Sequence, residues 1–331
     1  LLWDAGYMVW GWPERVGGRG GPAALRAVVG EEIVERDLLV SGFFSMTETL
    51  APTLIGFASE ELAAEFVPRL LSGEEMWSQG FSEPGTGSDL ASLACRARRD
   101  GETWVINGQK VWTSLAQYST RCLLLTRTGT PESRHRGITA FFVDLDTPGI
   151  TVRPLSIMSG SDEFAEVFFD DVVVPDARRV GEIDGGWAVA MALLPFERST
   201  AFWHRTAFLQ SRLQTVVAAA PDDDHSAVLL GEAFAQLHAL RCRSRATVRR
   251  FDDGATLGPE TSVDKVLVAS VEQRIFDVAR ELDPLAVALP DGPDGDRRRD
   301  EYLYSRAASI YGGTGEIQRN IIARLLDLGD E

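Results

Sequence analysis

The sequence predicts an α+β protein in which a strand-rich domain lies between two helical regions. Apolar residues follow the 3.6-residue period of helices toward both ends of the chain, while the middle third reads as a series of strands. At 331 residues the chain is long enough for two or three subdomains. We expect an N-terminal helical domain over residues 1–75, a central β domain over 76–178 and a C-terminal four-helix bundle over 179–331.

The N-terminal region carries two clear helix signals. The stretch "AALRAVVGEEIVERDLLV", from residue 23, spaces its apolar residues by three and four positions, as a helix with one buried face does. Ser59 precedes "EELAAEFVPRLL", and a serine at this place predicts an N-cap. Residues 21–74 are therefore expected to be mainly helical.

The central region changes to strand-like runs such as "TWVI", "RCLLLTR" and "GITAFFVDL". Two dipeptides between or within these runs, Asp100-Gly101 and Asn107-Gly108, are typical of tight hairpin turns, which predicts two hairpins. Long helical patterns return over 185–219, 226–250, 259–288 and 300–327. The breaks between them, "PDDDHS" and "PDGPDGDRRRD", are acidic and rich in proline and glycine.

Charge and composition narrow the class of protein. The net charge of -16 argues against nucleic acid as a partner, because phosphate binding needs a dense cationic surface. No uninterrupted apolar run reaches about 18 residues, which argues against a membrane span. Cys95, Cys122 and Cys242 are scattered without metal-ligand spacing, so we expect reduced, buried thiols, a cytoplasmic protein and no metal site. The chain begins without Met, so a removed leader stays open.

Two segments of the central region have the composition of a cofactor site. In "WSQGFSEPGTGSDLASL" glycines allow backbone amides to approach an anion, and Ser88 can bond a phosphate oxygen. The segment "INGQKVWTSLA" is predicted to be a hairpin that presents Trp112, Thr113 and Ser114, an aromatic face beside two hydroxyls that suits a planar ring. The alternatives are a plain surface turn for the first segment and a core tryptophan for the second.

Together with "FFDDVVVP" and "IYGGTGEIQR", these segments resemble the acyl-CoA dehydrogenase family in order and spacing, from about residue 11 to 328. The resemblance implies a central β-barrel-like domain, FAD at a subunit interface, and a dimer or tetramer that acts on an acyl-CoA thioester, with electron-transfer flavoprotein as electron acceptor. It also suggests that the family's first helix is missing here. The FAD contacts that it implies are Gln79, Phe81, Ser82, Gly87, Ser88, Trp112, Thr113, Ser114, Thr314 and Glu316.

The catalytic base is the feature that departs from many family members. They carry a glutamate directly after the late tyrosine, where this chain has Gly312. In the branched-chain and long-chain types the base lies on the first long helix of the bundle, and this sequence resembles them with Glu197 there. We therefore expect Glu197 to be the base, with Arg198, Gly312 and Ser88 on the substrate side. The alternatives are an exposed Glu197–Arg198 pair and Glu316 as the base.

Two further departures concern the partner subunit. The Arg and Phe that usually reach the neighbour's FAD are replaced by "AAAPDDDHS", and a glycine-rich turn later in the bundle by "DPLAVALPDGPDG". Such changes resemble bacterial members that pair with a related chain, so a heterotetramer is an alternative to a homo-oligomer. A non-catalytic partner subunit and a flavin monooxygenase or oxidase on the same fold are the alternative functions. The acyl group is left open: straight, branched, steroid-derived or carrier-bound.

Overall fold

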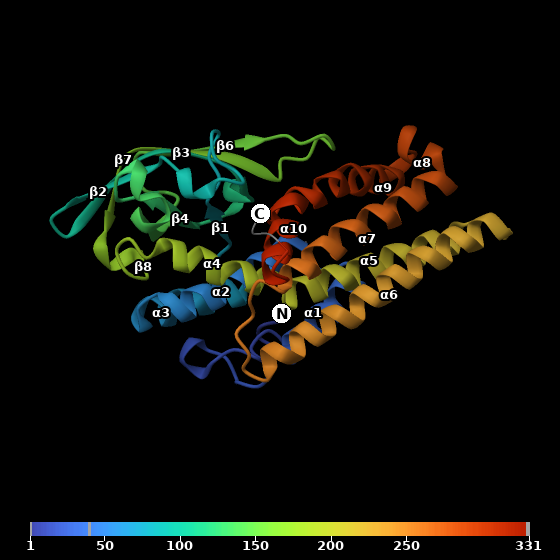
Figure 1. The fold of residues 1–331 in the computed structure, drawn as a ribbon. Coiled ribbons are helices and arrows are strands. Elements are labelled where there is room, and N and C mark those ends of the chain that lie inside the picture. Colours follow the sequence, from blue (N-terminus) through green and yellow to red (C-terminus); the bar gives the residue numbers. More distant parts are fainter. Residues whose placement is uncertain (1, 39–40, 329–331) are drawn as a thin grey trace. The chain divides into compact units, whose positions relative to one another are not determined.

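The structure, a computed structural model, describes residues 2–38 and 41–328, and side chains for 2–38 and 46–328. It contains two compact units. Unit 1 comprises Leu1–Gly21 and Gly42–Phe196, and unit 2 comprises Pro22–Ser41 and Glu197–Glu331. The predicted α+β class is confirmed, with helices before and after a central sheet (Figure 1).

Unit 1 is built on one twisted sheet. Within the described residues it has eight strands, in the order β6-β7-β3-β2-β4-β5-β8, with β1 paired to β4. The pairs are antiparallel except β1 with β4 and β2 with β4. The strands are β1 Trp77–Gly80, β2 Arg96–Asp100, β3 Thr103–Ser114, β4 Arg121–Arg127, β5 Ile138–Asp144, β6 Ile150–Leu155, β7 Phe164–Pro175 and β8 Arg179–Val180.

The two faces of this sheet bury different cores. Leu123 and Phe142 pack with α2 (Ser41–Phe57), α3 (Glu60–Ser72) and α4 (Gly186–Glu197). Their neighbours along the strands, Leu124 and Phe141, point the other way, into a second cluster formed by side chains from the strands themselves. This alternation follows from the two-residue period of a strand. It is what a β-barrel-like domain requires of its interior.

The predicted turn signals have different outcomes. Ser59 is the N-cap of α3, since its hydroxyl accepts a hydrogen bond from Leu62 N at 3.2 Å. Asp100-Gly101 begins the tight turn between β2 and β3, as predicted. The hairpin predicted at Asn107-Gly108 is wrong, because both residues lie inside β3, at an irregularity in its pairing with β7.

A long partner strand explains why β3 continues through the Asn-Gly pair. The Asn107 side chain bonds Asp171 across the sheet, donating to Oδ1 and accepting from the backbone amide at 2.9 Å each. Gly108 has φ +146°, and a Cβ there would lie 2.6 Å from the Cα of Cys95. The glycine therefore allows a close approach within the sheet, and Trp112 belongs to a strand instead of the predicted hairpin.

Unit 2 is helical. Its helices are α1 Ala23–Glu35, α5 Thr200–Ala219, α6 Asp224–Asp252, α7 Thr261–Leu282, α8 Pro284–Ala288, α9 Gly292–Ser305 and α10 Gly315–Leu325. The long helices α5, α6 and α7 run side by side in Figure 1 and share a core that includes Leu209, Leu237 and Ile275. Helix α1 packs on α5 and α6, where Trp203 Nε1 donates to Glu31 at 2.9 Å.

Three of the predicted long helices are interrupted. The pattern over 185–219 is two helices, α4 and α5, because the chain leaves helical geometry at Ser199 (φ -102°, ψ -107°). Glu197 is therefore the last residue of α4 and not part of one continuous helix. The 259–288 pattern breaks at Asp283, and the 300–327 pattern breaks at the turn that contains Gly312 and Gly313, with φ +62° and +94°.

Candidate active site

In unit 1 the structure brings the end of β1 and the end of β3 together. Val111 N donates to Ser82 O at 2.9 Å, and Lys110 Nζ donates to Phe81 O at 3.1 Å. Lys110 is fully buried and also pairs with Glu83 at 2.7 Å. The two segments that the sequence singled out are thus joined by backbone bonds and by one buried ion pair.

The predicted polar contacts of unit 1 include two buried atoms that lack a partner. Among the described residues, Gln79 Oε1 and Thr113 Oγ1 are buried and make no hydrogen bond. Buried polar atoms are normally satisfied, so each such exception needs an explanation. Both residues were predicted to contact the cofactor, and a ligand with its own donors and acceptors at this edge of unit 1 would satisfy them. Ser114, beside them at the end of β3, is half-buried.

Trp112 has an unusual backbone and an exposed ring. Its φ is +57°, a region that bulky side chains seldom adopt, and 59% of its surface is exposed. Its ring lies edge-to-face with that of Phe164, with 5.9 Å between the centroids. The alternative of a core tryptophan is therefore wrong. An exposed aromatic face held in a strained conformation is typical of a ligand site.

The glycine loop after β1 is on the surface. Glu83 and Thr86 close its turn with reciprocal backbone hydrogen bonds of 3.0 Å, while Gly87 and Ser88 are exposed. A Cβ on Gly87 would meet nothing within 4 Å, so packing inside the chain does not require this glycine. The neighbouring Asp89 pairs with Arg134 at 2.5 Å.

In unit 2 the structure brings Glu197 and Gly312 together. A Cβ built on Gly312 would lie 2.6 Å from Glu197 Oε1, a separation that real Cβ atoms do not show. Glu197 is half-buried, and Gly312 has a backbone conformation that disfavours other residues. The carboxylate therefore occupies the space that a side chain at position 312 would need.

Two buried cations accompany this carboxylate. Arg198 approaches Gly312 O and Ser262 Oγ at 3.4 Å each, and burial lowers its pKa while the charge of Glu197 opposes that shift. Lys265 donates to Ala308 O at 2.6 Å and lies 4.1 Å from the centre of the Tyr311 ring. Burial lowers the pKa of Lys265 to about 8, against the opposing charges of Glu197 and Glu272.

Sequence reasoning missed Lys265, which contacts Ala308 and Tyr311 in the segment that leads into the Gly312 turn. One signal was available: the chain has two lysines, Lys110 and Lys265, and both lie in segments with a regular apolar period. Both are buried, with 0% and 2% of their surface exposed. A rare lysine within an apolar pattern is better explained by a buried internal partner than by solvent contact.

The beginning of α10 forms the third predicted group. Thr314 is the N-cap, accepting from Ile317 N at 3.3 Å, and Glu316 is exposed in the first turn. Hydrogen bonds from its own backbone and from Thr314 lower the pKa of Glu316. A cavity of about 220 Å³ adjoins this turn, and its lining includes Lys265, Gln273, Thr314, Glu316 and Gln318.

Neither a metal cluster nor a membrane-spanning helix appears in the described parts of the chain. Over residues 2–38 and 41–328 no group of three or more His, Cys, Asp and Glu side chains is placed to hold a metal ion. Nor does any helix in these ranges combine the length and apolarity needed to cross a bilayer. The sequence also suggests Phe43, Phe44 and Leu54 as the lining of an acyl pocket. The side chains of Phe43 and Phe44 lie outside the described residues, and Leu54 is fully buried in the core of unit 1.

Comparison with known proteins defines the class. Three family models match: the acyl-CoA dehydrogenase N-terminal domain over residues 1–74, the middle domain over 78–172 and the C-terminal domain over 184–326. The chain is 41% identical to acyl-CoA dehydrogenase IpdE1 of Mycobacterium tuberculosis, over 99% of this chain and 86% of that protein. The chain belongs to the acyl-CoA dehydrogenase family, whose members are flavin-dependent oxidoreductases.

Solved structures agree with this assignment. A protein described as the Tcur3481-Tcur3483 steroid ACAD, in a G363A variant, matches with a TM-score of 0.91 at 26% identity, over 100% of this chain and 88% of that one. The ChsE4-ChsE5 complex from Mycobacterium tuberculosis matches with a TM-score of 0.85 at 29% identity, over 99% and 88%. The predicted family, fold and enzyme class are therefore confirmed.

We predict that the stability of the protein depends on pH through Lys265. Its pKa is lower in the folded state (about 8) than its ordinary value of 10.5, so the unfolded chain holds the proton more tightly between these two pH values. Stability should therefore rise with pH across this window, by up to about 3 kcal/mol for a shift of this size. In urea unfolding, the free energy of unfolding of wild type relative to that of Lys265→Met should be larger at pH 9.5 than at pH 7.5. A difference that stays constant with pH would contradict the burial argument.

Proposed function

We propose that this chain catalyses FAD-dependent α,β-dehydrogenation of an acyl-CoA or acyl-carrier thioester, with Glu197 as the base that removes the Cα proton. The observation that supports this most directly is the 2.6 Å separation between Glu197 Oε1 and the Cβ position of Gly312. Family members that carry their glutamate after the late tyrosine fill position 312. In this chain the carboxylate of Glu197 occupies that space instead.

The residues of unit 1 fit a bound flavin. A flavin ring offers both hydrogen-bond donors and acceptors, which matches the unpaired Gln79 Oε1 and Thr113 Oγ1. The exposed face of Trp112 offers a stacking surface for a planar ring. Phe81, Ser82 and Ser114 complete the proposed ring contacts. Gly87, Ser88, Thr314 and Glu316 are proposed for the rest of FAD on the ground of family resemblance.

The chemistry requires a base and a hydride acceptor. When bound, FAD would supply the acceptor for hydride from Cβ. Glu197 would take the Cα proton, and its position at the end of α4 fixes where that proton must be presented. Arg198 and Lys265 would place positive charge beside Glu197; Arg198 also approaches Gly312 O, and Lys265 donates to Ala308 O just before that turn. Arg198 is buried, so we assign it this positioning role beside its expected place on the substrate side.

We propose the substrate class from the description of a structural relative. The Tcur3481-Tcur3483 protein is described as a steroid ACAD, so a CoA thioester of a polycyclic, steroid-derived acid is the first candidate. Electron-transfer flavoprotein is the proposed electron acceptor. A screen of straight-chain, branched and steroid-derived thioesters, read by bleaching of the flavin colour, would identify the acyl group.

Heteromeric assembly is the proposed alternative to a homo-oligomer. The two segments that depart from the family's cross-subunit contacts favour a related but different partner chain, and one structural relative is a complex of two named chains, ChsE4 and ChsE5. A non-catalytic role for this chain in such an assembly is the alternative function. The position of Glu197 argues against that role and against a monooxygenase or oxidase.

We predict that Trp112→Ala lowers flavin retention much more than it lowers stability. The substitution removes a stacking face that is mostly exposed and leaves the β core intact. Loss of one stacked aromatic partner costs about 0.5–1.5 kcal/mol beyond burial, which weakens binding several-fold. The amount of flavin that stays bound per chain after desalting measures the effect. Denaturation should release this flavin as FAD. Tyr118→Ala, which alters another exposed aromatic of unit 1, is the control. Equal flavin loss in both variants, or release of FMN, would contradict the proposed site.

We predict that Glu197→Gln keeps the fold, the FAD and thioester binding, yet slows flavin reduction by about 10²–10⁴-fold, as loss of a general base typically does. Stopped-flow bleaching of the flavin by acyl-CoA measures this. Glu182→Gln, on a side chain that is 93% exposed, is the matched control. If Glu197→Gln bleaches its flavin as fast as wild type, Glu197 is not the base.

The Glu197–Gly312 geometry also suggests how the lost rate of flavin reduction could be recovered with a carboxylate at position 312. Glu197→Gln with Gly312→Glu would leave two side chains in one space, so room must be made first. Glu197→Ala with Gly312→Glu should recover part of the lost rate, limited by the strain of a side chain at φ +62°. Glu197→Ala alone is the baseline. No recovery in a variant that is folded and retains FAD would contradict a shared position for the two carboxylates.

We predict an oligomer formed through α6 and α10. Large apolar side chains are exposed on both, namely Val228 (60%) and Phe234 (63%) on α6 and Leu325 (49%) on α10. Phe234→Asp should shift the mass measured by light scattering toward the monomer, because it places a charge in a buried contact. Tyr7→Asp, at another exposed aromatic, is the control. A wild-type monomer at micromolar concentration that retains FAD and activity would contradict this interface.

A further inference from the structure

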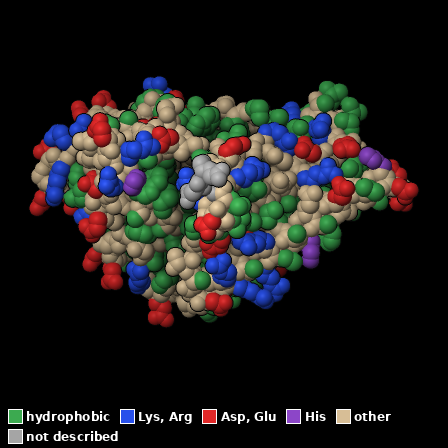
Figure 2. All heavy atoms as spheres, in the orientation of Figure 1, with side chains coloured by type: hydrophobic (Ala, Val, Ile, Leu, Met, Phe, Trp, Pro, Cys, Tyr) green, Lys and Arg blue, Asp and Glu red, His purple; other side chains and the backbone are tan. Residues whose placement is uncertain are grey.

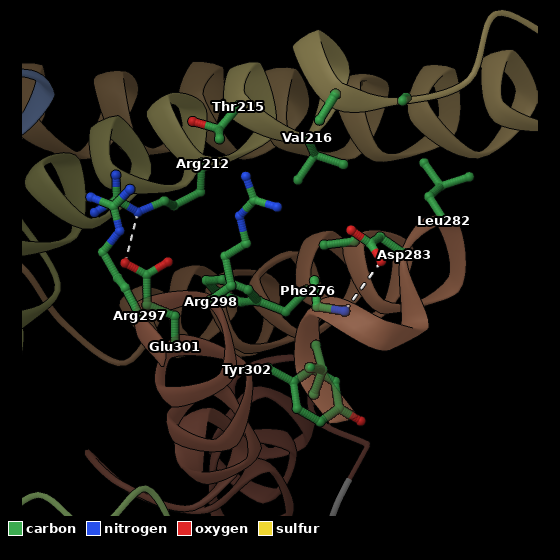
Figure 3. A pocket seen from close by; sticks show the side chains of 15 residues that line it. Arg212, Thr215, Val216, Phe276, Leu282, Asp283, Arg297, Arg298, Glu301 and Tyr302 are labelled. Carbon is green, nitrogen blue, oxygen red and sulfur yellow. Dashed lines mark hydrogen bonds and ion pairs between the residues drawn. The ribbon is translucent and has the colours of Figure 1, made fainter. Parts of the chain in front are cut away.

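A second cleft lies inside unit 2, between α5, α7, α8 and α9 (Figure 3). Its volume is about 70 Å³ and its mouth opens to solvent, so it can take a slender apolar group and not a bulky one. Its walls are mainly apolar and include Val216 from α5, Phe276 and Leu282 from α7, and Val287 from α8. The cleft is separate from the Glu197–Gly312 contact, to which none of these residues belongs.

Two chain segments that the family resemblance marked as departures contribute to the walls. Ala219 and Ala220 come from the "AAAPDDDHS" stretch, while Ala286 and Val287 come from "DPLAVALP". These are the two places where the sequence departs from the cofactor contacts of the family. In the structure the two segments line one cleft together, with apolar side chains. Figure 2 shows apolar side chains gathered over the region that Figure 1 labels α8, where Leu285 and Leu289 are 64% and 72% exposed.

The charges at the mouth of the cleft are paired except for one. Arg212 bonds Glu301 at 2.8 Å and Asp37 at 2.9 Å. Arg297 pairs with Asp294 at 3.2 Å and with Asp37 at 3.5 Å. The carboxylate of Asp283 caps α8 by accepting from Ala286 N at 3.1 Å. These acidic groups are therefore committed to contacts within the unit.

Arg298 is the exception. It is the middle arginine of "RRRD", and within the described ranges it alone of the three has no ion pair or hydrogen bond, since Arg299 pairs with Asp296 and Asp300. Figure 3 shows the Arg298 side chain extending from α9 toward α5 over the cleft. A guanidinium with free donors beside an apolar cavity suits one negatively charged oxygen group attached to an apolar body.

We propose that this cleft binds an amphipathic carboxylate, with its apolar body against Val216, Phe276 and Val287 and its carboxylate on Arg298. The apolar walls would supply most of the binding free energy through area removed from water. Arg298 would supply orientation and selectivity for an anion. None of the lining residues is a proposed FAD contact or belongs to the Glu197–Gly312 pair, so the test does not depend on the proposed function.

The test uses decanoate and the assembled, flavin-containing protein, with calorimetric titration as the readout. We expect saturable binding at one site per chain, and binding about tenfold weaker or more in Arg298→Gln, because a hydrogen bond to a charged group is lost. Arg299→Gln, on the adjacent arginine that is already paired, is the matched control and should bind as wild type does. Decanol, which has the same chain without the charge, should bind as weakly to wild type as decanoate binds to Arg298→Gln.

Filling the cleft is the second arm. Ala286→Trp and Ala219→Leu each add a larger side chain to a different wall of the cleft. Each should weaken decanoate binding, and two variants are used so that one remains informative if the other does not fold. Far-UV circular dichroism verifies the fold of each variant. The proposal is overturned if decanoate does not bind saturably, if it binds equally well to Arg298→Gln, or if both filled variants bind as wild type does.

Discussion

The Gly312 turn of unit 2 is shaped by one steric constraint: the Glu197 carboxylate lies where a side chain at position 312 would begin, so a residue there would have to displace it. Gly312 leaves the space, its positive φ turns the chain into α10, and Glu197 reaches that space from the end of α4. A carboxylate can be supplied to one point from either of two distant places in the chain. In this chain the carboxylate comes from Glu197 at the end of α4, and position 312 is a glycine.

Buried cations stabilise this arrangement. Lys265 and Arg198 hold the two sides of the Gly312 turn through carbonyl oxygens, and Glu197 supplies negative charge to both. Removing a charged side chain from water is costly unless partners replace the water, and here backbone carbonyls, an aromatic face and one carboxylate do so. The same groups therefore hold the turn and place positive charge beside the proposed base.

Unit 1 presents its proposed cofactor contacts differently. Its ion pair, Lys110 with Glu83, is buried and complete, and it joins β3 to the loop after β1. At the same edge Gln79 and Thr113 keep unpaired oxygens and Trp112 keeps an exposed ring. A folded chain seldom leaves such groups unsatisfied without a ligand to complete them. The paired Lys110 and Glu83 thus belong to the scaffold of this edge, while Gln79, Trp112 and Thr113 form its proposed binding surface.

The sequence by itself determined the α+β order of elements, the cap at Ser59 and the family, because periodicity and motif spacing are local properties of a chain. It also singled out Glu197, which stays the proposed base. The tertiary structure decided where the elements break. The Asn107-Gly108 pair has the composition of a turn, yet pairing with β7 keeps it inside a strand. Periodicity likewise continued through Ser199, where the backbone leaves the helix. The approach of Glu197 to Gly312, the burial of Lys265 and the unpaired Arg298 over an apolar cleft depend on contacts between residues far apart in sequence, and a local pattern carries no information on them.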